Sequence, residues 1–260
     1  MNEVNKTLYI PLYGKAAVSR RGILLDDPMA EKIWDKEGFE LHGKAKSKWL
    51  CYYMGMRSAV FDRWLISELE KYPDAVVLGI GCGLDSRICR VGARGHQWYD
   101  LDFPEVIAER KKYYSEDECY HMLEGDARET GWIDRIPSGG RLILLMEGVS
   151  MYMEPQQTRG LLRALRGRFD EMSALIDCYT VFAAKASKYK NPINEVGVWQ
   201  LYGVDDPREL EVDGLRFVAE RELTPADMID ELTGFDRRFF RLMFGGRAAK
   251  KIYRLFEYAG

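Results

Sequence analysis

The segment AVVLGIGCGLDSR at residues 75–87 decides the fold, because an apolar run enters three glycines at alternate positions. A short run of Ala, Val and Leu bounded by glycines is typical of a parallel strand that is buried on both faces. Gly79, Gly81 and Gly83 carry no side chain, so the backbone of the turn can approach a bound ligand closely. The segment therefore predicts a strand that ends in a tight, ligand-binding turn.

The turn departs from the dinucleotide-binding fingerprint at two positions. The third glycine of that fingerprint would stand at residue 84, where this chain has Leu84. Asp85 then puts an acid where a pyrophosphate would need backbone N–H groups and no anion. An acid suits a ligand with a positive end, such as the amino group and sulfonium of S-adenosylmethionine. The alternative is a tight turn that binds nothing.

Acidic residues follow the next predicted strands. These strands are expected at residues 97–101, 120–125 and 141–146. Because the carboxyl ends of parallel strands share one edge of a sheet, we expect Asp102, Asp126 and Glu147 to converge on one crevice. A carboxylate at Asp102 suits two ribose hydroxyls, and Asp126 can accept from an adenine amino group. The alternative is that these acids cap the helices that follow.

Four motifs together resemble a known family: LGIGCGLDSR, WYDLDFPEVI, GDAR and MEGVSMYM. They are similar to the leucine carboxyl methyltransferase family of class I S-adenosylmethionine-dependent methyltransferases. Within it, the chain most resembles the bacterial tetracenomycin-type polyketide O-methyltransferases. The resemblance spans residues 8–180 and thins toward the C-terminus.

The resemblance implies an α/β, Rossmann-like class I methyltransferase fold. Its sheet is expected to be mostly parallel and seven-stranded with an antiparallel last strand, beside an N-terminal helical cap. The expected reaction transfers a methyl group from S-adenosyl-L-methionine to an oxygen acceptor, leaves S-adenosylhomocysteine and uses no metal. The expected acceptor is a carboxylate or phenolic hydroxyl of a small molecule, such as a polyketide-like acid.

The chain divides into two expected parts. Residues 1–70 carry helical patterns and form the cap, while residues 71–260 form the methyltransferase domain with an irregular insertion at about 183–212. Asp27 before Pro28 is a helix start, since proline at the first helical position loses no hydrogen bond. Further helices are expected at 48–71, 86–91, 104–114, 155–168 and 225–232, and further strands at 173–179, 216–223 and 251–258.

Basic residues of the cap are expected to complete the cofactor site. Arg57 lies in an apolar stretch, and a guanidinium can hold the methionine carboxylate of the cofactor with two hydrogen bonds. The resemblance implies the same arginine; the alternative is an ion pair with an acid such as Asp62. Lys15 lies in a segment expected to close over the cofactor, where it can bind either the cofactor's or the acceptor's carboxylate. The GDAR motif adds Ala127 to the expected cofactor contacts.

The sulfonium methyl group is already activated, so the protein mainly has to bring an oxygen into line with it. Such positioning lowers a barrier by roughly 7 to 11 kcal/mol. With Glu147, Tyr152 is the expected catalytic residue, as a contact to the acceptor oxygen; its alternative is a core aromatic. Aromatic residues after the fifth strand are expected either to enclose a ring-containing substrate or to fill the core: Tyr179, Phe182, Tyr189, Trp199 and Tyr202.

Composition narrows the remaining classes. A net charge of -3 without a basic stripe argues against nucleic acid, and no apolar run reaches the length of about 20 residues of a membrane span. Five cysteines without a C-x-x-C pair and three scattered histidines argue for a reducing compartment and against zinc. We expect a cytoplasmic monomer or homodimer. Two alternatives remain: a protein C-terminal carboxyl methyltransferase and a non-catalytic S-adenosylmethionine- or nucleotide-binding protein.

Overall fold

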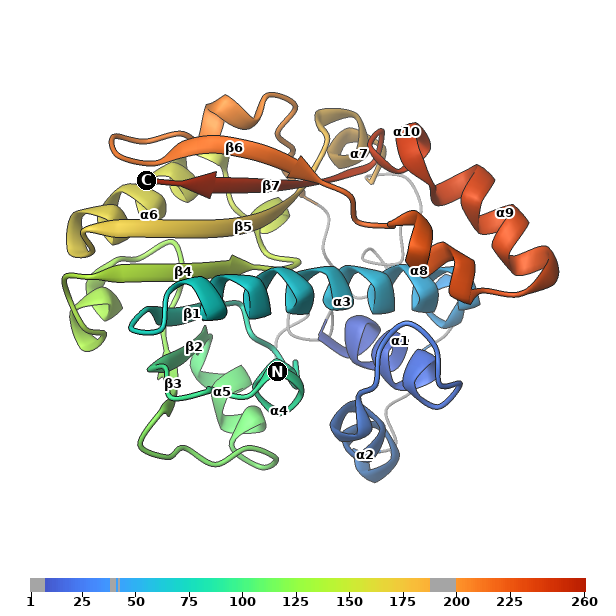
Figure 1. Ribbon diagram of the computed structural model, residues 1–260, viewed down its shortest axis with the longest axis horizontal. Coiled ribbons are helices and arrows are strands. Elements are labelled where there is room, and N and C mark those ends of the chain that lie inside the picture. Colours follow the sequence, from blue (N-terminus) through green and yellow to red (C-terminus); the bar gives the residue numbers. More distant parts are fainter. Residues whose placement is uncertain (1–7, 38–40, 42, 188–199) are drawn as a thin grey trace.

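One mixed sheet organises the molecule (Figure 1). The computed structural model describes residues 8–37, 41, 43–187 and 200–260. In this part of the chain seven strands pair in the order β3-β2-β1-β4-β5-β7-β6. They are β1 Val76–Ile80, β2 Trp98–Asp102, β3 Tyr120–Glu124, β4 Arg141–Met146, β5 Glu171–Tyr179, β6 Arg216–Arg221 and β7 Tyr253–Ala259. Only β7 runs against its neighbours, which confirms the predicted sheet with its antiparallel last strand.

The central strands bury both faces, as their unbroken apolar sequences require. Val77 on β1 faces one hydrophobic cluster together with Phe61 and Leu65 of the helix α3 (Lys48–Lys71). Leu78, the next residue of β1, faces the opposite cluster with Leu162 of the helix α6 (Pro155–Arg168). The sheet is therefore covered on both sides, with α3 in front of it in Figure 1.

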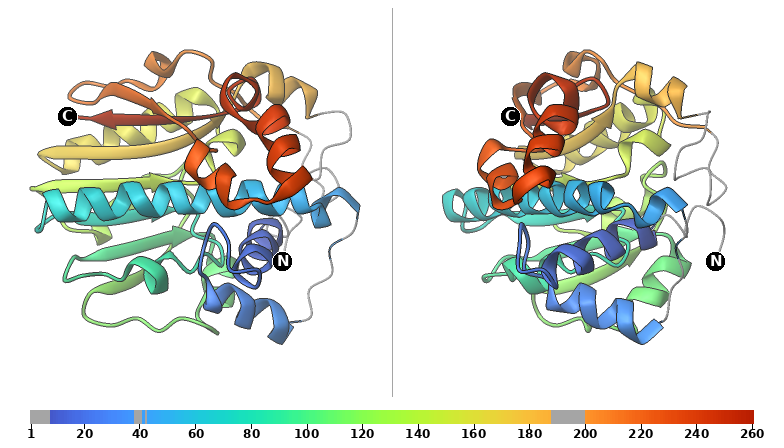
Figure 2. Two further views of the ribbon diagram at one scale, coloured as in Figure 1. Left: turned by 45° about the vertical axis from the view of Figure 1, so that its right-hand side comes forward. Right: turned by 90° about the vertical axis from the view of Figure 1, so that its right-hand side faces the viewer.

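Helices occupy the carboxyl edge of the sheet as well as its faces. Besides α3 and α6 they are α1 Tyr9–Ser19, α2 Pro28–Glu37, α4 Arg87–Val91, α5 Pro104–Arg110, α7 Val181–Ala186, α8 Ala226–Glu231, α9 Gly234–Phe244 and α10 Gly246–Ala249. The N-terminal half of α3 projects past the strand ends, where α1 and α2 lie (Figures 1 and 2). None of the described helices is both long and apolar enough to span a membrane.

The helical cap is built from both ends of the chain. Between β6 and β7 the chain forms α8, α9 and α10, of which the sequence pattern predicted only one helix, at 225–232. Phe240 of α9 and Met228 of α8 are fully buried in one cluster with Val18 of α1 and Tyr52 of α3. The C-terminal helices thus join the N-terminal ones over the strand ends.

The glycine turn after β1 has steric reasons for its composition. A Cβ at Gly79 would lie 2.6 Å from Oδ1 of Asp100 on the paired strand β2. Gly81 has φ +67°, and a Cβ there would collide with the side chain of Val149. The turn therefore brings its backbone to the carboxyl edge without side chains in the way.

Replacing Gly81 with alanine should lower the free energy of unfolding. The loss should exceed the cost of placing alanine in a left-handed backbone conformation. A left-handed conformation costs a non-glycine residue about 1–2 kcal/mol, and at Gly81 the collision with Val149 adds to this. Gly22→Ala is the matched control, because Gly22 has φ +62° and no atom lies within 4 Å of the position that its Cβ would take. Denaturant unfolding measures both, and equal losses would contradict the steric explanation.

Candidate active site

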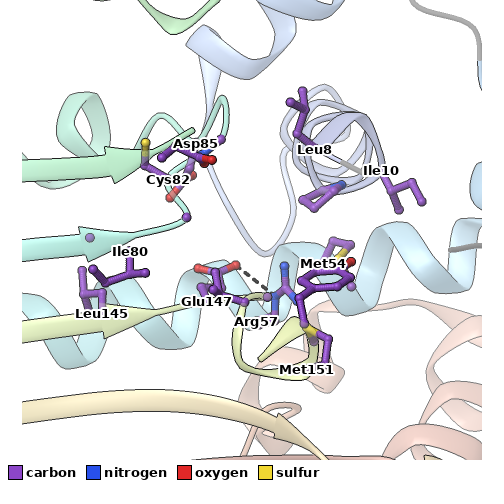
Figure 3. A pocket seen from close by; sticks show the side chains of 18 of the residues that line it. Leu8, Ile10, Met54, Arg57, Ile80, Cys82, Asp85, Leu145, Glu147 and Met151 are labelled. Atoms are coloured by element: carbon purple, nitrogen blue, oxygen red, sulfur yellow. Dashed lines mark hydrogen bonds and ion pairs between the residues drawn. The ribbon is translucent and has the colours of Figure 1, made fainter. Parts of the chain in front are cut away.

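One cavity at the carboxyl edge gathers the residues that the sequence singled out. Its volume is about 1000 Å³. It lies between the strand ends and the cap, and Figure 3 shows Arg57, Asp85 and Glu147 among its lining residues, with Arg57 and Glu147 in direct contact. Every predicted site residue lines it: Lys15, Arg57, Gly79, Gly81, Gly83, Asp85, Asp102, Asp126, Ala127, Glu147 and Tyr152.

Glu147, directly after β4, is held by two arginines. Arg57 Nε donates to its Oε1 at 3.0 Å, Ser58 Oγ donates to the same oxygen at 2.9 Å, and Arg87 Nη2 donates to Oε2. Burial alone would raise the pKa of Glu147, but Arg87 and Arg57 lower this pKa to about 2. Glu147 is therefore ionised and fixed in place.

The structure changes the interpretation of Asp85. The sequence suggested an acid that receives the positive end of a ligand, but three cations of the protein already surround this carboxylate. Lys15 donates to Oδ1, Arg87 Nη1 lies 2.9 Å from Oδ2 and Arg90 Nη1 lies 3.1 Å from Oδ1. These cations outweigh burial and hold the pKa of Asp85 well below its usual value. Its charge is thus neutralised inside the protein.

Lys15 cannot bind an acceptor carboxylate as it stands. Its ammonium group is 3% exposed and is paired with Asp85. This pair connects α1 to the glycine turn, so Lys15 would have to leave Asp85 to reach another carboxylate.

Arg57 keeps one nitrogen for a ligand. Its Nη1 donates to the Tyr253 hydroxyl at 3.1 Å and lies 3.5 Å from Oδ2 of Asp177. Asp62, the alternative partner in the sequence analysis, binds Arg87 and Arg90 instead. The hydrogen bonds of Arg57 to Glu147 and Tyr253 engage Nε and Nη1, not Nη2. A ligand carboxylate in the cavity can take this position.

Asp102 ends β2 beside the glycine turn. Its carboxylate accepts from the backbone N–H groups of Gly83 and Phe103, both at 2.8 Å. Burial raises the pKa of Asp102 to about 6 even though these two hydrogen bonds lower it. Asp102 therefore titrates close to neutral pH.

Asp126 lies at the outer end of the same cavity. Arg128 binds its carboxylate through Nε at 2.9 Å and also through Nη2, and both residues line the cavity. Ala127 packs against the hydrophobic cluster that contains Leu78 of β1 and Leu162 of α6. The three acids after β2, β3 and β4 therefore do converge on one cavity, as the spacing predicted.

The far end of the cavity is aromatic, and sequence reasoning missed most of it. Trp49 and Tyr53 come from the first turns of α3, Phe244 ends α9 and Tyr253 begins β7. Of the aromatic residues expected after β5, Tyr179 lines the cavity. Phe182 is 69% exposed and Tyr202 donates to Glu154, so neither lines it. Tyr189 and Trp199 lie outside the described residues.

The missed aromatics carry no local signal. Trp49 and Tyr53 are spaced four residues apart, which equally fits a core-facing helix stripe. Only the position of α3 past the strand ends shows that this stripe faces a cavity. Tyr152 belongs to a short 3-10 turn, Ser150–Tyr152, and is half-buried beside the same cavity.

Solved structures of methyltransferases share this fold. A putative methyltransferase from Thermobifida fusca superposes with a TM-score of 0.56 at 14% identity, covering 85% of this chain and 90% of that one. Magnesium protoporphyrin IX methyltransferase from Synechocystis PCC 6803 gives a TM-score of 0.54 at 13% identity, covering 88% and 92%. At these identities the likeness concerns the fold.

Comparisons of sequence then show the family. The tetracenomycin polyketide synthesis O-methyltransferase TcmP of Streptomyces glaucescens is 28% identical over 218 residues, covering 82% of this chain and 81% of the relative. An S-adenosyl-L-methionine-dependent methyltransferase of Gibberella zeae is 26% identical over 240 residues, covering 82% and 80%. The leucine carboxyl methyltransferase family model matches residues 11–166. The chain belongs to this family of S-adenosylmethionine-dependent O-methyltransferases.

The cavity fits the cofactor that this family uses. S-Adenosylmethionine has a carboxylate at one end, a ribose diol in the middle and an adenine at the other end. Arg57 offers Nη2 to a carboxylate, Asp102 offers acceptor oxygens, and the bare backbone at Gly81 leaves room between them. These groups can therefore meet the carboxylate and the ribose of the cofactor.

Cofactor affinity should depend on the protonation of Asp102. The ribose hydroxyls need an ionised carboxylate, and the pKa of Asp102 is about 6 in the free protein. Lowering the pH through 6 protonates Asp102, so the affinity for S-adenosylhomocysteine should fall about tenfold between pH 8 and pH 5. Isothermal titration calorimetry measures it.

Asp102→Asn supplies the control for this pH dependence. The variant should bind S-adenosylhomocysteine more weakly at pH 8 and lose the change near pH 6. If it keeps the pH dependence of the wild type, another group is responsible.

Asp85→Asn should strongly destabilise the fold. It leaves Lys15, Arg87 and Arg90 with one anion fewer in a buried place, which costs about 3–5 kcal/mol in comparable cases. Asp227→Asn is the matched control, because Asp227 pairs with Arg63 where both side chains are more than half exposed. Denaturant unfolding should separate the two variants clearly; similar losses would show that the buried network is not structural.

Proposed function

We propose that this chain methylates a carboxylate or a phenolic hydroxyl of a flat, apolar small molecule, such as a polyketide-like acid. The observation that carries the proposal is the continuity of one cavity from the glycine turn to the aromatic side chains. Aromatic rings suit a ring-containing acceptor, since they give large apolar contacts with defined geometry. The tetracenomycin relative supports the same acceptor class.

The proposed site assigns each residue a task. The backbone of the glycine turn lies against the cofactor. Arg57 binds the cofactor's carboxylate through Nη2, and Asp102 accepts hydrogen bonds from its ribose hydroxyls. Asp126 and Ala127 border the adenine. Glu147 is fixed between Arg57 and Arg87, so it keeps the carboxylate-binding guanidinium in position. Tyr152 contacts the acceptor oxygen.

The mechanism is mainly one of positioning. The bound cofactor supplies an activated methyl group on a sulfonium. The protein's residues hold the acceptor oxygen in line with it and exclude water through the apolar lining of Met54, Met151 and Phe244. A carboxylate acceptor needs no base, whereas a hydroxyl acceptor must lose its proton.

We further propose the setting in which this reaction occurs. The enzyme works in the cytoplasm as a monomer or homodimer, without nucleic acid and without a membrane partner. Its cap, residues 1–70, and its cofactor-binding domain, residues 71–260, act as one folding unit because charged and apolar contacts of α1 and α3 cross between them.

A labelling screen tests the acceptor class. Methyl-labelled S-adenosylmethionine is offered with aromatic acids, phenols and peptides that end in a free carboxylate, and we expect label in the small aromatic compounds. Label found only in peptides would favour a protein carboxyl methyltransferase. Asp102→Ala should lose S-adenosylhomocysteine binding, and unchanged binding in this variant would overturn the cofactor site.

A further inference from the structure

A buried carboxylate and a tyrosine form a pair that the reaction described above does not use. Asp177, near the end of β5, has no exposed surface. The Tyr253 hydroxyl donates to its Oδ2 at 2.8 Å. The backbone N–H of Gly148 donates to both oxygens, at 2.8 and 2.9 Å. The pair lies between the cavity and the protein interior, because Tyr253 lines the cavity and Asp177 lies behind it.

The hydrogen bonds around Tyr253 leave one position open. Its hydroxyl donates its proton to Asp177 and accepts one hydrogen bond from Arg57 Nη1 at 3.1 Å. A tyrosine hydroxyl oxygen can accept a second hydrogen bond. An acceptor hydroxyl in the cavity can supply it. The proton of that hydroxyl would then be two hydrogen bonds away from Asp177.

The surroundings place an aromatic ring beside this position. Tyr179 and Tyr53 pack edge-on against the Tyr253 ring, with centroids 4.9 and 6.1 Å away, and all three line the cavity. Phe244 borders Tyr53 at 6.4 Å. A flat hydroxylated ring can pack among them with its oxygen toward Tyr253.

We propose that Tyr253, backed by Asp177, is the base that takes the proton from a phenolic hydroxyl acceptor. This deepens the proposed function and rests on it: of the two acceptor classes above, it selects the hydroxyl. Tyr253 is then a catalytic residue besides Tyr152, because it also touches the acceptor, and Asp177 is the group that finally holds the proton.

The step balances in atoms and electrons. The acceptor oxygen forms a bond to the methyl carbon while the carbon–sulfur bond breaks and leaves its electron pair on sulfur. The acceptor proton passes to the Tyr253 oxygen, and the proton of Tyr253 passes to Oδ2 of Asp177. No oxidant or further reactant is needed, and the proton returns to water by the same route when the product leaves.

The charges around Asp177 suit a proton acceptor. Arg57 on α3 lowers the pKa of Asp177 and Glu147 after β4 raises it, while the hydrogen bond from Tyr253 on β7 lowers it. Burial raises the pKa of Asp177 to about 6, with Arg57 opposing the rise. Asp177 is thus ionised at pH 7 but close to the value at which a base works well.

Two matched acceptors test the proposal, 2-naphthol and 2-naphthoic acid, because they present a hydroxyl and a carboxylate on the same flat ring. At saturating cofactor, Tyr253→Phe and Asp177→Asn should each lower kcat for 2-naphthol by about 100-fold or more, the usual contribution of a general base. Below pH 6 the logarithm of the wild-type kcat should fall with pH with a slope of one. Asp177→Asn should abolish this pH dependence. Saturation removes the effect of Asp102 on cofactor binding.

A binding measurement gives a second readout without turnover. In the presence of S-adenosylhomocysteine, 2-naphthol should bind about tenfold more weakly to Tyr253→Phe than to the wild type. Tyr258→Phe is the control on the same strand: it loses a hydrogen bond to Pro207 at 2.8 Å, and it does not line the cavity. Tyr258→Phe should keep the wild-type affinity and kcat.

The outcomes separate the two proposals. If S-adenosylhomocysteine does not bind, the proposed function itself fails. If S-adenosylhomocysteine binds but no hydroxyl compound receives the methyl group, the base proposal is overturned. Cofactor binding then still stands. Equal losses in Tyr253→Phe and Tyr258→Phe would reduce Tyr253 to a structural role and also overturn it.

Discussion

A chain of buried ion pairs fixes the geometry of the cavity. It runs from Lys15 through Asp85, Arg87 and Glu147 to Arg57. Charges removed from water need partners in good geometry, since an unpaired buried charge is far more costly than an unpaired surface charge. The cap helices α1 and α3 are therefore held in the position that completes these pairs. The cofactor site and the attachment of the cap depend on the same interactions.

Arg57 connects the two ends of the cavity. On one side it holds Glu147, and on the other it binds Tyr253 and faces Asp177; in the proposed site its Nη2 also binds the cofactor carboxylate. A guanidinium suits this task because its donors are fixed in one plane and it stays charged at every relevant pH. In the proposed site, one side chain therefore contacts both the methyl donor and the proposed base. Asp177 lies at the boundary between the two ends, and burial raises its pKa to about 6, as it does for Asp102.

The parts of the site that could be predicted are those that follow from local pattern and from the geometry of parallel sheets. The glycine turn, Asp102, Asp126 and Glu147 lie together because each is at or just after the carboxyl end of a parallel strand, and all such strand ends share one edge. The environment of Asp85 could not be predicted this way. Its partner Lys15 stands 70 residues earlier in the chain and reaches it only through the packing of α1.

The sequence by itself determined that acidic residues stand at the ends of successive parallel strands. It also determined the parallel sheet with its reversed last strand, and the family. These depend on periodicity and on motifs whose spacing is local. The tertiary structure decided which charges are neutralised, which aromatic side chains face the cavity, and that Tyr253 meets Asp177. Those contacts join residues far apart in sequence, and they form only when the helices from both chain ends pack over the strand ends.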